Sequence, residues 1–96
     1  MTMRIEVRVP DLGLEPDTPI RVTHWYATVR EPVLAGDRLV ELLVPGAVYE
    51  VPCPADGTLD EVLVRPTSRV VPGQLLGIVS VAEAASVSSP DSGSTP

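Results

Sequence analysis

Few side chains of this chain could do covalent chemistry or bind a metal. His24 and Cys53 are the only histidine and the only cysteine among the 96 residues. They are the only soft or borderline metal ligands of the chain, and two ligands alone do not make a zinc site, which uses three or four. A Cys–His nucleophilic pair would need an orienting group and an oxyanion hole, and no motif supplies either. There is also no paired-carboxylate, Ser/His/Asp or glycine-rich phosphate-loop motif. We therefore expect no metal and no catalytic residue.

The chain has no lysine and hence no side-chain amine. All seven basic residues are arginine, and the formal net charge is -6. A guanidinium stays protonated and is a poor nucleophile. The charge balance provides no basic patch for phosphates, which argues against nucleic acid and anionic membranes as partners. A lone cysteine fits a reducing compartment, and no apolar stretch approaches the roughly 20 residues of a membrane span. The sequence thus predicts a cytoplasmic protein.

Proline and glycine divide the chain into short apolar segments. Eleven Pro and seven Gly are spread along it, and they leave no helix-length window before position 82. Val-rich and alternating runs predict strands instead. The predicted strands are residues 4–9, 20–29, 38–44, 47–51, 59–64, 70–71 and 75–79. The pattern favours an all-β domain over residues 1–81, followed by a disordered Ser/Pro/Gly-rich tail over residues 82–96.

The segment around Pro45-Gly46 is unusually apolar. Proline followed by glycine between two strands predicts a type II turn, because its second central residue needs a positive φ. Two interpretations of the surrounding residues remain open. They form an exposed docking surface for a partner or for self-association, or alternate residues face the core and the others are ordinary β-surface. The docking tip would consist of Leu43, Val44, Pro45, Gly46, Ala47 and Val48.

Several motifs with consistent spacing carry a family resemblance. Residues 33–39 match residues 70–76 at an offset of 37 positions (73 minus 36), which indicates two similar halves. The other motifs are Val9-Pro10-Asp11-Leu12-Gly13, the series Trp25, Val33, Gly36, Leu39 and Glu41, the segment 50–59, and Gly73-Gln74-Leu75-Leu76. Together they resemble the biotinyl/lipoyl carrier domains over about residues 4–80. The resemblance is closest to the lipoyl domains of 2-oxo acid dehydrogenase acyltransferase subunits.

The resemblance implies a fold and a place for individual side chains. The implied fold is a flattened β-barrel (barrel-sandwich hybrid) of two four-stranded sheets with pseudo-two-fold symmetry. Trp25 is expected to pack against the core, His24 to face solvent, and Cys53 to be a small packed side chain. The acidic residues Glu15, Asp17, Asp60 and Glu61 are expected to be solvated.

The chain departs from the family at the hairpin. Lipoyl domains have Glu-Thr-Asp-Lys-Ala there and biotinyl domains have Ala-Met-Lys-Met, whereas residues 43–47 are Leu-Val-Pro-Gly-Ala. The modified lysine therefore aligns with Gly46, and we expect no covalent cofactor. The family's two Gly-Asp turns beside the hairpin are also replaced, by Arg30-Glu31 and Thr67-Ser68.

These features predict a non-enzymatic lipoyl-like domain that acts by protein contact, in docking or assembly. The alternative is a vestigial or regulatory relative of a carrier, associated with a 2-oxo acid dehydrogenase or a biotin-dependent carboxylase complex. In either case the resemblance implies a protein partner in such a complex. A third reading is the scaffold of an efflux membrane-fusion subunit, whose lipoyl-like domains also lack the lysine. Those domains have a long coiled-coil insertion at the hairpin, and this chain has a tight turn.

Overall fold

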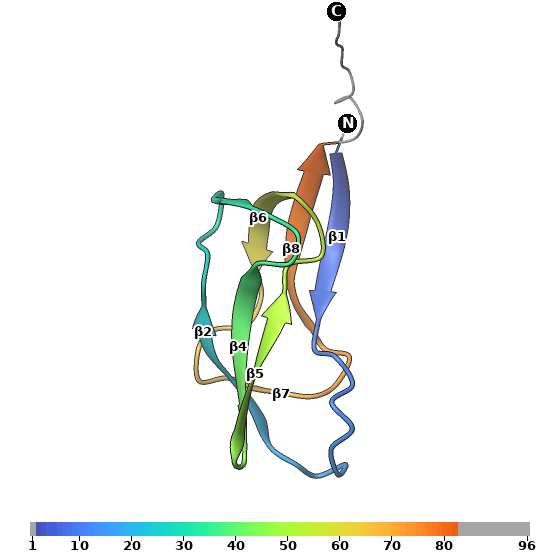
Figure 1. The fold of residues 1–96 in the computed structure, drawn as a ribbon, viewed down its shortest axis with the longest axis vertical. Helices are drawn as coiled ribbons and strands as arrows, with labels where there is room; N and C mark the ends of the chain where they lie inside the picture. The colour runs from blue at the N-terminus through green and yellow to red at the C-terminus, as the bar shows by residue number, and fades with distance from the viewer. Residues whose placement is uncertain (1, 83–96) are drawn as a thin grey trace, which may run out of the picture.

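The computed structural model describes residues 2–82, which form eight strands and no helix (Figure 1). In several strands alternating apolar residues bury one face, as over Ile20–Trp25. Ala82, which the sequence placed in the tail, ends the last strand, and the rest of that predicted tail lies outside the described residues.

The strands form two four-stranded antiparallel sheets. The first has the order β1 (Thr2–Arg8), β8 (Leu75–Ala82), β6 (Gly57–Val62) and β3 (Pro32–Val33). The second has the order β5 (Ala47–Pro52), β4 (Arg38–Val44), β2 (Ile20–Trp25) and β7 (Arg69–Val70). The sheets are not closed into a continuous barrel, which fits the expected flattened barrel-sandwich of two four-stranded sheets. In Figure 1 the β4–β5 hairpin lies at one end of the molecule, opposite the start of β1 and the end of β8.

The two halves of the chain are related by a pseudo-two-fold axis. Exchanging β1–β4 with β5–β8 converts one sheet order into the other. β6, β7 and β8 begin 37 positions after β2, β3 and β4 (57 minus 20, for example). The hydrogen bonds repeat too, because the Arg30 amide donates to the Leu59 carbonyl at 2.6 Å. Its counterpart, the Thr67 amide, donates to the Val22 carbonyl, also at 2.6 Å. The repeat seen in the sequence is therefore a structural repeat.

An aliphatic core lies between the two sheets. The largest fully buried side chains are Ile20, Leu39, Leu42, Leu59, Leu76, Val22, Val40 and Val79. Because no described polar or charged residue is buried, the core requires no internal hydrogen-bond partners. Trp25 packs against this cluster from the side, and its indole Nε1 donates to the Val64 carbonyl at 2.9 Å. The expected core role of Trp25 is confirmed.

Several predicted strand bounds differ from the structure, and one short strand was not predicted. The strand expected over 20–29 ends at Trp25, because the chain bends after Tyr26 and leaves the sheet. Pro32–Val33, which no predicted strand included, forms the short strand β3 and pairs with β6 through Thr58 and Gly57. β-forming residue types such as Thr28 and Val29 describe local preference, whereas these boundaries are set by which strand lies alongside.

The replaced Gly-Asp turns keep a conformation that normally favours glycine. Arg30 has φ 79° and Thr67 has φ 76°, and these are the only non-glycine residues with positive φ in the described part of the chain. The two positions are related by the 37-residue repeat. Left-handed backbone costs an L-residue about 1–2 kcal/mol, and most for a β-branched side chain such as threonine.

We expect Thr67→Gly to raise the free energy of unfolding by about 1 kcal/mol, because glycine adopts positive φ without a Cβ clash. Urea unfolding followed by the fluorescence of Trp25 measures the change. Thr58→Gly, inside strand β6, is the control and should lower stability by about 0.5–1 kcal/mol. Equal loss of stability in both variants would show that Thr67 is not strained.

Candidate functional site

The β4–β5 hairpin protrudes on a two-residue turn. Val44 pairs with Ala47, which leaves Pro45 and Gly46 as the connection. Gly46 has φ 79°, as the second central residue of a type II turn requires. A Cβ built at Gly46 would meet no atom within 4 Å. Gly46 is therefore at a bare, solvent-open turn.

The residues of the predicted docking tip divide between two faces. Leu43 is 44% exposed and Val48 is 54% exposed, and the two are cross-strand partners. Val44 is only 3% exposed and, like Leu42, faces the core. Pro45, Gly46 and Ala47 are exposed. Because the side chains of β4 alternate between its two faces, Val44 points into the core. Leu43 and Val48 are therefore the main apolar side chains on the outer surface of the hairpin.

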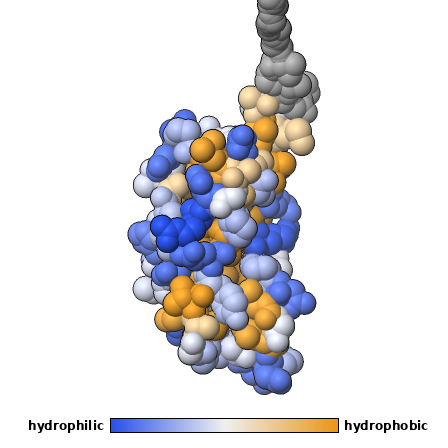
Figure 2. All heavy atoms as spheres, viewed as in Figure 1, coloured by the Kyte–Doolittle hydropathy of each residue, from blue (hydrophilic) through white to orange (hydrophobic). Residues whose placement is uncertain are grey.

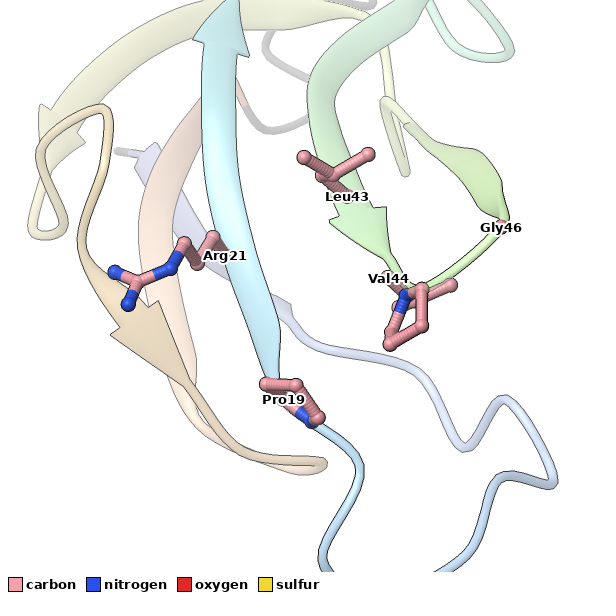
Figure 3. A pocket seen from close by; sticks show the side chains of 6 residues that line it. Pro19, Arg21, Leu43, Val44 and Gly46 are labelled. Carbon is pink, nitrogen blue, oxygen red and sulfur yellow. The ribbon is translucent and has the colours of Figure 1, made fainter.

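A shallow pocket of about 350 Å³ opens beside the turn (Figure 3). It is lined by Pro19, Arg21, Leu43, Val44, Pro45 and Gly46. Most of these groups are apolar, and Arg21 supplies the one charged side chain. In Figure 2 apolar surface lies among polar surface toward the hairpin end of the molecule.

One row of side chains crosses the outer face of the second sheet next to this pocket. Val48 pairs with Leu43, Leu43 with Arg21, and Arg21 with Arg69. All four residues are exposed, whereas the strand neighbours Ile20, Val22, Leu42, Val44 and Val70 are buried. We call these four residues the outer row. Its first half is apolar and its second half is cationic.

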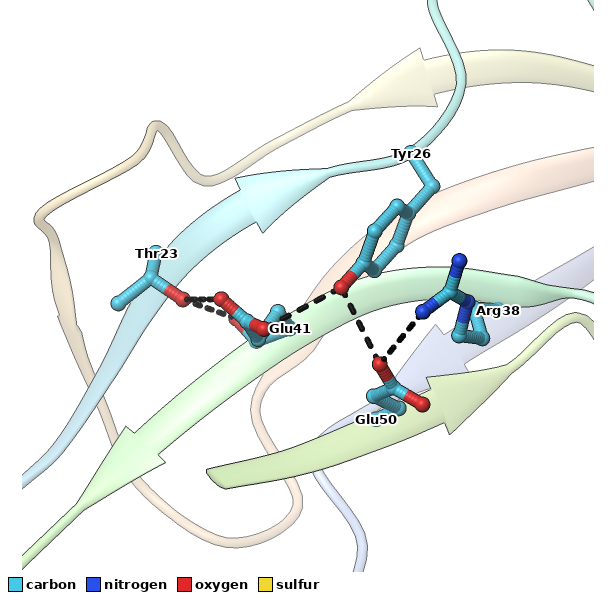
Figure 4. A network of polar contacts seen from close by, with 5 residues as sticks. All are labelled: Thr23, Tyr26, Arg38, Glu41 and Glu50. Carbon is cyan, nitrogen blue, oxygen red and sulfur yellow. Dashed lines mark hydrogen bonds and ion pairs between the residues drawn. The ribbon is translucent and has the colours of Figure 1, made fainter. Parts of the chain in front are cut away.

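A polar cluster follows the outer row along the same sheet (Figure 4). The Thr23 hydroxyl donates to Glu41 Oε1 at 2.7 Å, and the Tyr26 hydroxyl lies 3.2 Å from both Glu41 Oε2 and Glu50 Oε2. Arg38 Nη1 donates to Glu50 Oε2 at 3.1 Å, and its guanidinium carbon lies 4.6 Å from the Tyr26 ring centroid. Desolvation, followed by the negative charge of Glu41, raises the pKa of Tyr26 above its ordinary value of 10.0. Glu41 and Glu50 therefore already have partners.

We expect a Tyr49→Phe protein, in which Tyr26 is the one remaining tyrosine, to ionise with a midpoint above 10.0. Because the folded state binds the Tyr26 proton more tightly than the unfolded state, the protein loses folding stability as the pH rises through the tyrosine range. The ultraviolet absorbance of tyrosinate measures the midpoint. Adding Glu41→Gln should lower the pKa, and an unchanged midpoint would contradict the contribution of the carboxylate.

The other residues noted in the sequence lie apart from the hairpin turn. His24 is exposed, as expected, with its ring edge-on to Tyr26 at 4.7 Å between centroids. Cys53 is 3% exposed within the core cluster, and its thiol lies 3.1 Å from the Ala55 carbonyl. The expected packed role of Cys53 is confirmed. Among residues 2–82 no three His, Cys, Asp or Glu side chains are grouped to hold a metal ion.

The acidic residues differ from one another in their contacts. Glu15 and Asp17 are exposed, as expected. Asp60 and Glu61 are part-buried and both ion-pair with Arg4 of β1, the latter at 2.5 Å. These two carboxylates thus bridge strands β6 and β1 across β8. No helix within residues 2–82 is long and apolar enough to cross a membrane.

Sequence reasoning did not find the outer row or the polar cluster. Leu43 and Val48 were included in the docking tip, but Arg21 and Arg69 were not connected with them. The alternation within β2 and β4 was a usable signal for which residues face outward. The pairing of β2 with β7 was not, because the two strands are separated by more than forty residues.

Comparison with known proteins agrees with this geometry. Residues 5–79 match the Biotin_lipoyl family, described as "Biotin-requiring enzyme". The dihydrolipoyllysine-residue succinyltransferase component of the 2-oxoglutarate dehydrogenase complex of Bartonella vinsonii subsp. berkhoffii is 37% identical over 93 residues, 97% of this chain and 22% of that protein. The same component from Haemophilus influenzae is 38% identical over 87 residues, 91% of this chain and 21% of that protein.

A second kind of component is also similar. The dihydrolipoyllysine-residue acetyltransferase component of the pyruvate dehydrogenase complex of Haemophilus influenzae is 32% identical over 95 residues, 96% of this chain and 16% of that protein. The chain thus spans about a fifth of the length of these relatives. With a family match over most of its length and two sheets related by a pseudo-dyad, the chain belongs to the biotin/lipoyl domain family.

Proposed function

We propose that this domain is non-enzymatic, holds no covalent cofactor, and acts by protein contact through its hairpin end. The observation that carries the proposal is Gly46 at the hairpin turn, the position that the resemblance aligns with the family's modified lysine. A lipoyl or biotinyl group is joined by an amide to a lysine ε-amine, and neither Gly46 nor any other residue of this chain has one. The arginines cannot substitute, because they remain protonated.

The surface at the turn supports contact as the role. A swinging arm would be served by a polar, acidic tip, whereas Leu43 and Val48 expose apolar surface beside a shallow pocket. Exposed apolar groups near a pocket are typical of recognition surfaces. The relatives are named as components of 2-oxoglutarate and pyruvate dehydrogenase complexes. We infer a partner in a complex of that kind, with a carboxylase complex as the second choice.

The alternative is a vestigial or regulatory domain that competes with lipoyl-bearing domains for their partner enzymes. The identity of 37% to a lipoyl-type acyltransferase component favours a shared partner surface. Adding the chain to an assembled dehydrogenase complex separates the two roles. A competitor lowers the overall rate progressively as its concentration rises, whereas an assembly module leaves the rate of the complete complex unchanged.

Intact-mass spectrometry of the chain purified from its native host tests the absence of an arm. We expect the mass of the bare polypeptide. A mass increase equal to a lipoyl or biotinyl group would refute the proposal, whatever the site of attachment.

A lysine introduced at the turn tests how much of the surface recognised by a carrier-modifying ligase remains. The Pro45→Asp/Gly46→Lys variant places lysine at the open turn and removes the proline that fixes it. Incubated with lipoate, ATP and a lipoate–protein ligase, this variant should gain a lipoyl mass, whereas the wild type and a Val48→Lys control should not. Modification of Val48→Lys alone would contradict the alignment of Gly46 with the family's lysine.

Affinity purification tests the docking surface. Leu43→Ser/Val48→Ser changes the two outward apolar side chains and leaves the core untouched. We expect this variant to lose partners that the wild type recovers. Leu34→Ser/Val71→Ser is a matched control, because those side chains are each 60% exposed and belong to neither sheet. Equal recovery by all three proteins would eliminate the hairpin as the docking surface.

A further inference from the structure

The cationic half of the outer row has no acidic partner in the described part of the chain. Arg4, Arg8 and Arg38 each ion-pair with a carboxylate. Arg21 donates only to a backbone oxygen, that of Thr67 at 2.9 Å, and Arg69 makes no ion pair within residues 2–82. Figure 3 shows the Arg21 side chain extending away from Leu43, toward the strand that carries Arg69.

The register makes this arrangement unfavourable for the isolated domain. Arg21 and Arg69 are directly opposite each other in an antiparallel pair. Like charges in that position destabilise a sheet. The chain has thirteen acidic residues and a net charge of -6, yet none of the described acidic residues forms an ion pair with either arginine. Two neighbouring unpaired cations on an acidic protein are explained if a bound anion neutralises both.

The apolar half specifies what accompanies the anion. Leu43 and Val48 lie next to Arg21 in the same row, and neighbouring strands are about 4.8 Å apart. The centre of the apolar pair is therefore roughly 10 Å from the centre of the arginine pair. An extended peptide covers about that distance in three residues. A small inorganic anion would leave the apolar half uncovered.

We propose that the outer row, with its adjoining pocket, binds a segment of a partner protein that carries apolar side chains followed, about three residues later, by carboxylates. This inference rests on the proposed contact function and names the chemistry of the partner. The apolar side chains cover Leu43 and Val48 and reach the pocket. The carboxylates accept hydrogen bonds from Arg21 and Arg69, and the planar guanidinium suits bidentate pairing.

A second copy of this chain fits the row less well. The acidic groups on the same sheet face, Glu41 and Glu50, lie on the strands that carry Leu43 and Val48. Their carboxylates are already engaged by Thr23, Tyr26 and Arg38. In a face-to-face dimer whose two-fold axis runs parallel to the strands, Leu43 and Val48 of one copy would lie against the arginines of the other. If the two-fold axis instead ran across the strands, between the outer row and the polar cluster, Leu43 and Val48 of one copy would lie over Glu41 and Glu50 of the other.

The test uses the full ¹⁵N-labelled chain and a blocked peptide, acetyl-Leu-Val-Ser-Glu-Glu-amide, titrated by NMR. We expect amide shifts confined to the outer row and the residues of the pocket, and weaker binding at higher salt. Two control peptides replace both glutamates with glutamine, or the Leu-Val pair with Ser-Ser. Each control should bind less tightly than the parent peptide.

Variants of the protein separate specific pairing from general charge. Arg21→Gln/Arg69→Gln should weaken the affinity for the parent peptide about fivefold, as expected for loss of two exposed ion pairs. Arg4→Gln/Arg30→Gln changes the net charge equally but lies outside the second sheet, and should change the affinity less than about twofold. Leu43→Ser/Val48→Ser should weaken binding by a similar factor to the first variant.

Three outcomes would overturn the inference. These are shifts away from the outer row, equal affinity for the glutamate and glutamine peptides, and self-association of the free chain through this face. Failure of the contact function is detected separately, because a covalent arm in the intact mass would refute that function whatever the peptide does. A bare mass with no peptide binding refutes only the partner chemistry.

Discussion

Gly57→Ala is expected to destabilise the protein strongly. A Cβ at this position would lie 2.1 Å from the Ser80 carbonyl oxygen and 3.0 Å from its carbon. Both are backbone atoms of β8, which pairs with β6 and also with β1. They cannot move aside without breaking a strand pair at the centre of the first sheet. We expect a loss of about 3 kcal/mol or more, because overpacking against backbone exceeds the usual 1–3 kcal/mol of a flexible core.

Circular dichroism and urea unfolding of Gly57→Ala measure this loss. Gly36→Ala is the control, since its Cβ would have no neighbour within 4 Å and its only cost is a φ of 90°. We expect about 1–2 kcal/mol there. Gly77→Ala should resemble Gly57→Ala, because the Cβ added at position 77 would lie 2.5 Å from the backbone carbonyl oxygen of Glu61 and 3.0 Å from the Trp25 ring. If Gly57→Ala cost no more than Gly36→Ala, the close approach of β6 and β8 would be wrong.

Leu42→Ala is expected to lower the free energy of unfolding by about 2–5 kcal/mol, whereas Leu43→Ala should change it by less than about 0.5 kcal/mol. The two leucines are neighbours on one strand. Leu42 is 0% exposed inside the core cluster, and Leu43 is 44% exposed on the outer row. Truncating the first leaves a cavity between the sheets, and truncating the second removes groups already in contact with water.

Chemical unfolding of both variants, monitored by Trp25 fluorescence, measures the difference. A domain of this size has a total stability of roughly 4–12 kcal/mol, so Leu42→Ala removes a large fraction of it. The pair also separates folding from function, because Leu43→Ala should remain folded and still lose affinity for its partner. Similar stability losses in the two variants would mean that the register of β4 is shifted by one residue.

Much of the fold was predictable from local patterns. Alternation and apolar runs located the long strands, and Pro45-Gly46 located the turn with its positive φ. The two-residue strands β3 and β7 could not be delimited in this way, because pairing with a distant strand defines them and residue type does not. Thr67 illustrates the same limit, since nothing in a threonine indicates a left-handed backbone. Only the resemblance marked that position as one where the family has a Gly-Asp turn.

The candidate site was predictable in part. The apolar hairpin was visible as sequence, and alternation would have assigned Leu43 outward and Val44 inward. The cationic half was hidden, because Arg21 and Arg69 become neighbours only through the pairing of β2 with β7. Sequence separation of 48 positions (69 minus 21) conceals such a pair. Composition also misled here, since a net charge of -6 suggests no cationic surface, yet two arginines lie side by side.

The pseudo-two-fold axis has a consequence for how the domain is tethered. It relates the β4–β5 turn to the gap between the end of β8 and the start of β1, where Val81 pairs with Met3 as Val44 pairs with Ala47. Any polypeptide that precedes β1 or follows β8 therefore leaves from one pole, while the turn occupies the other. A neighbouring module joined at that pole would be attached on the side of the domain opposite the hairpin, so its attachment point would not cover the hairpin surface.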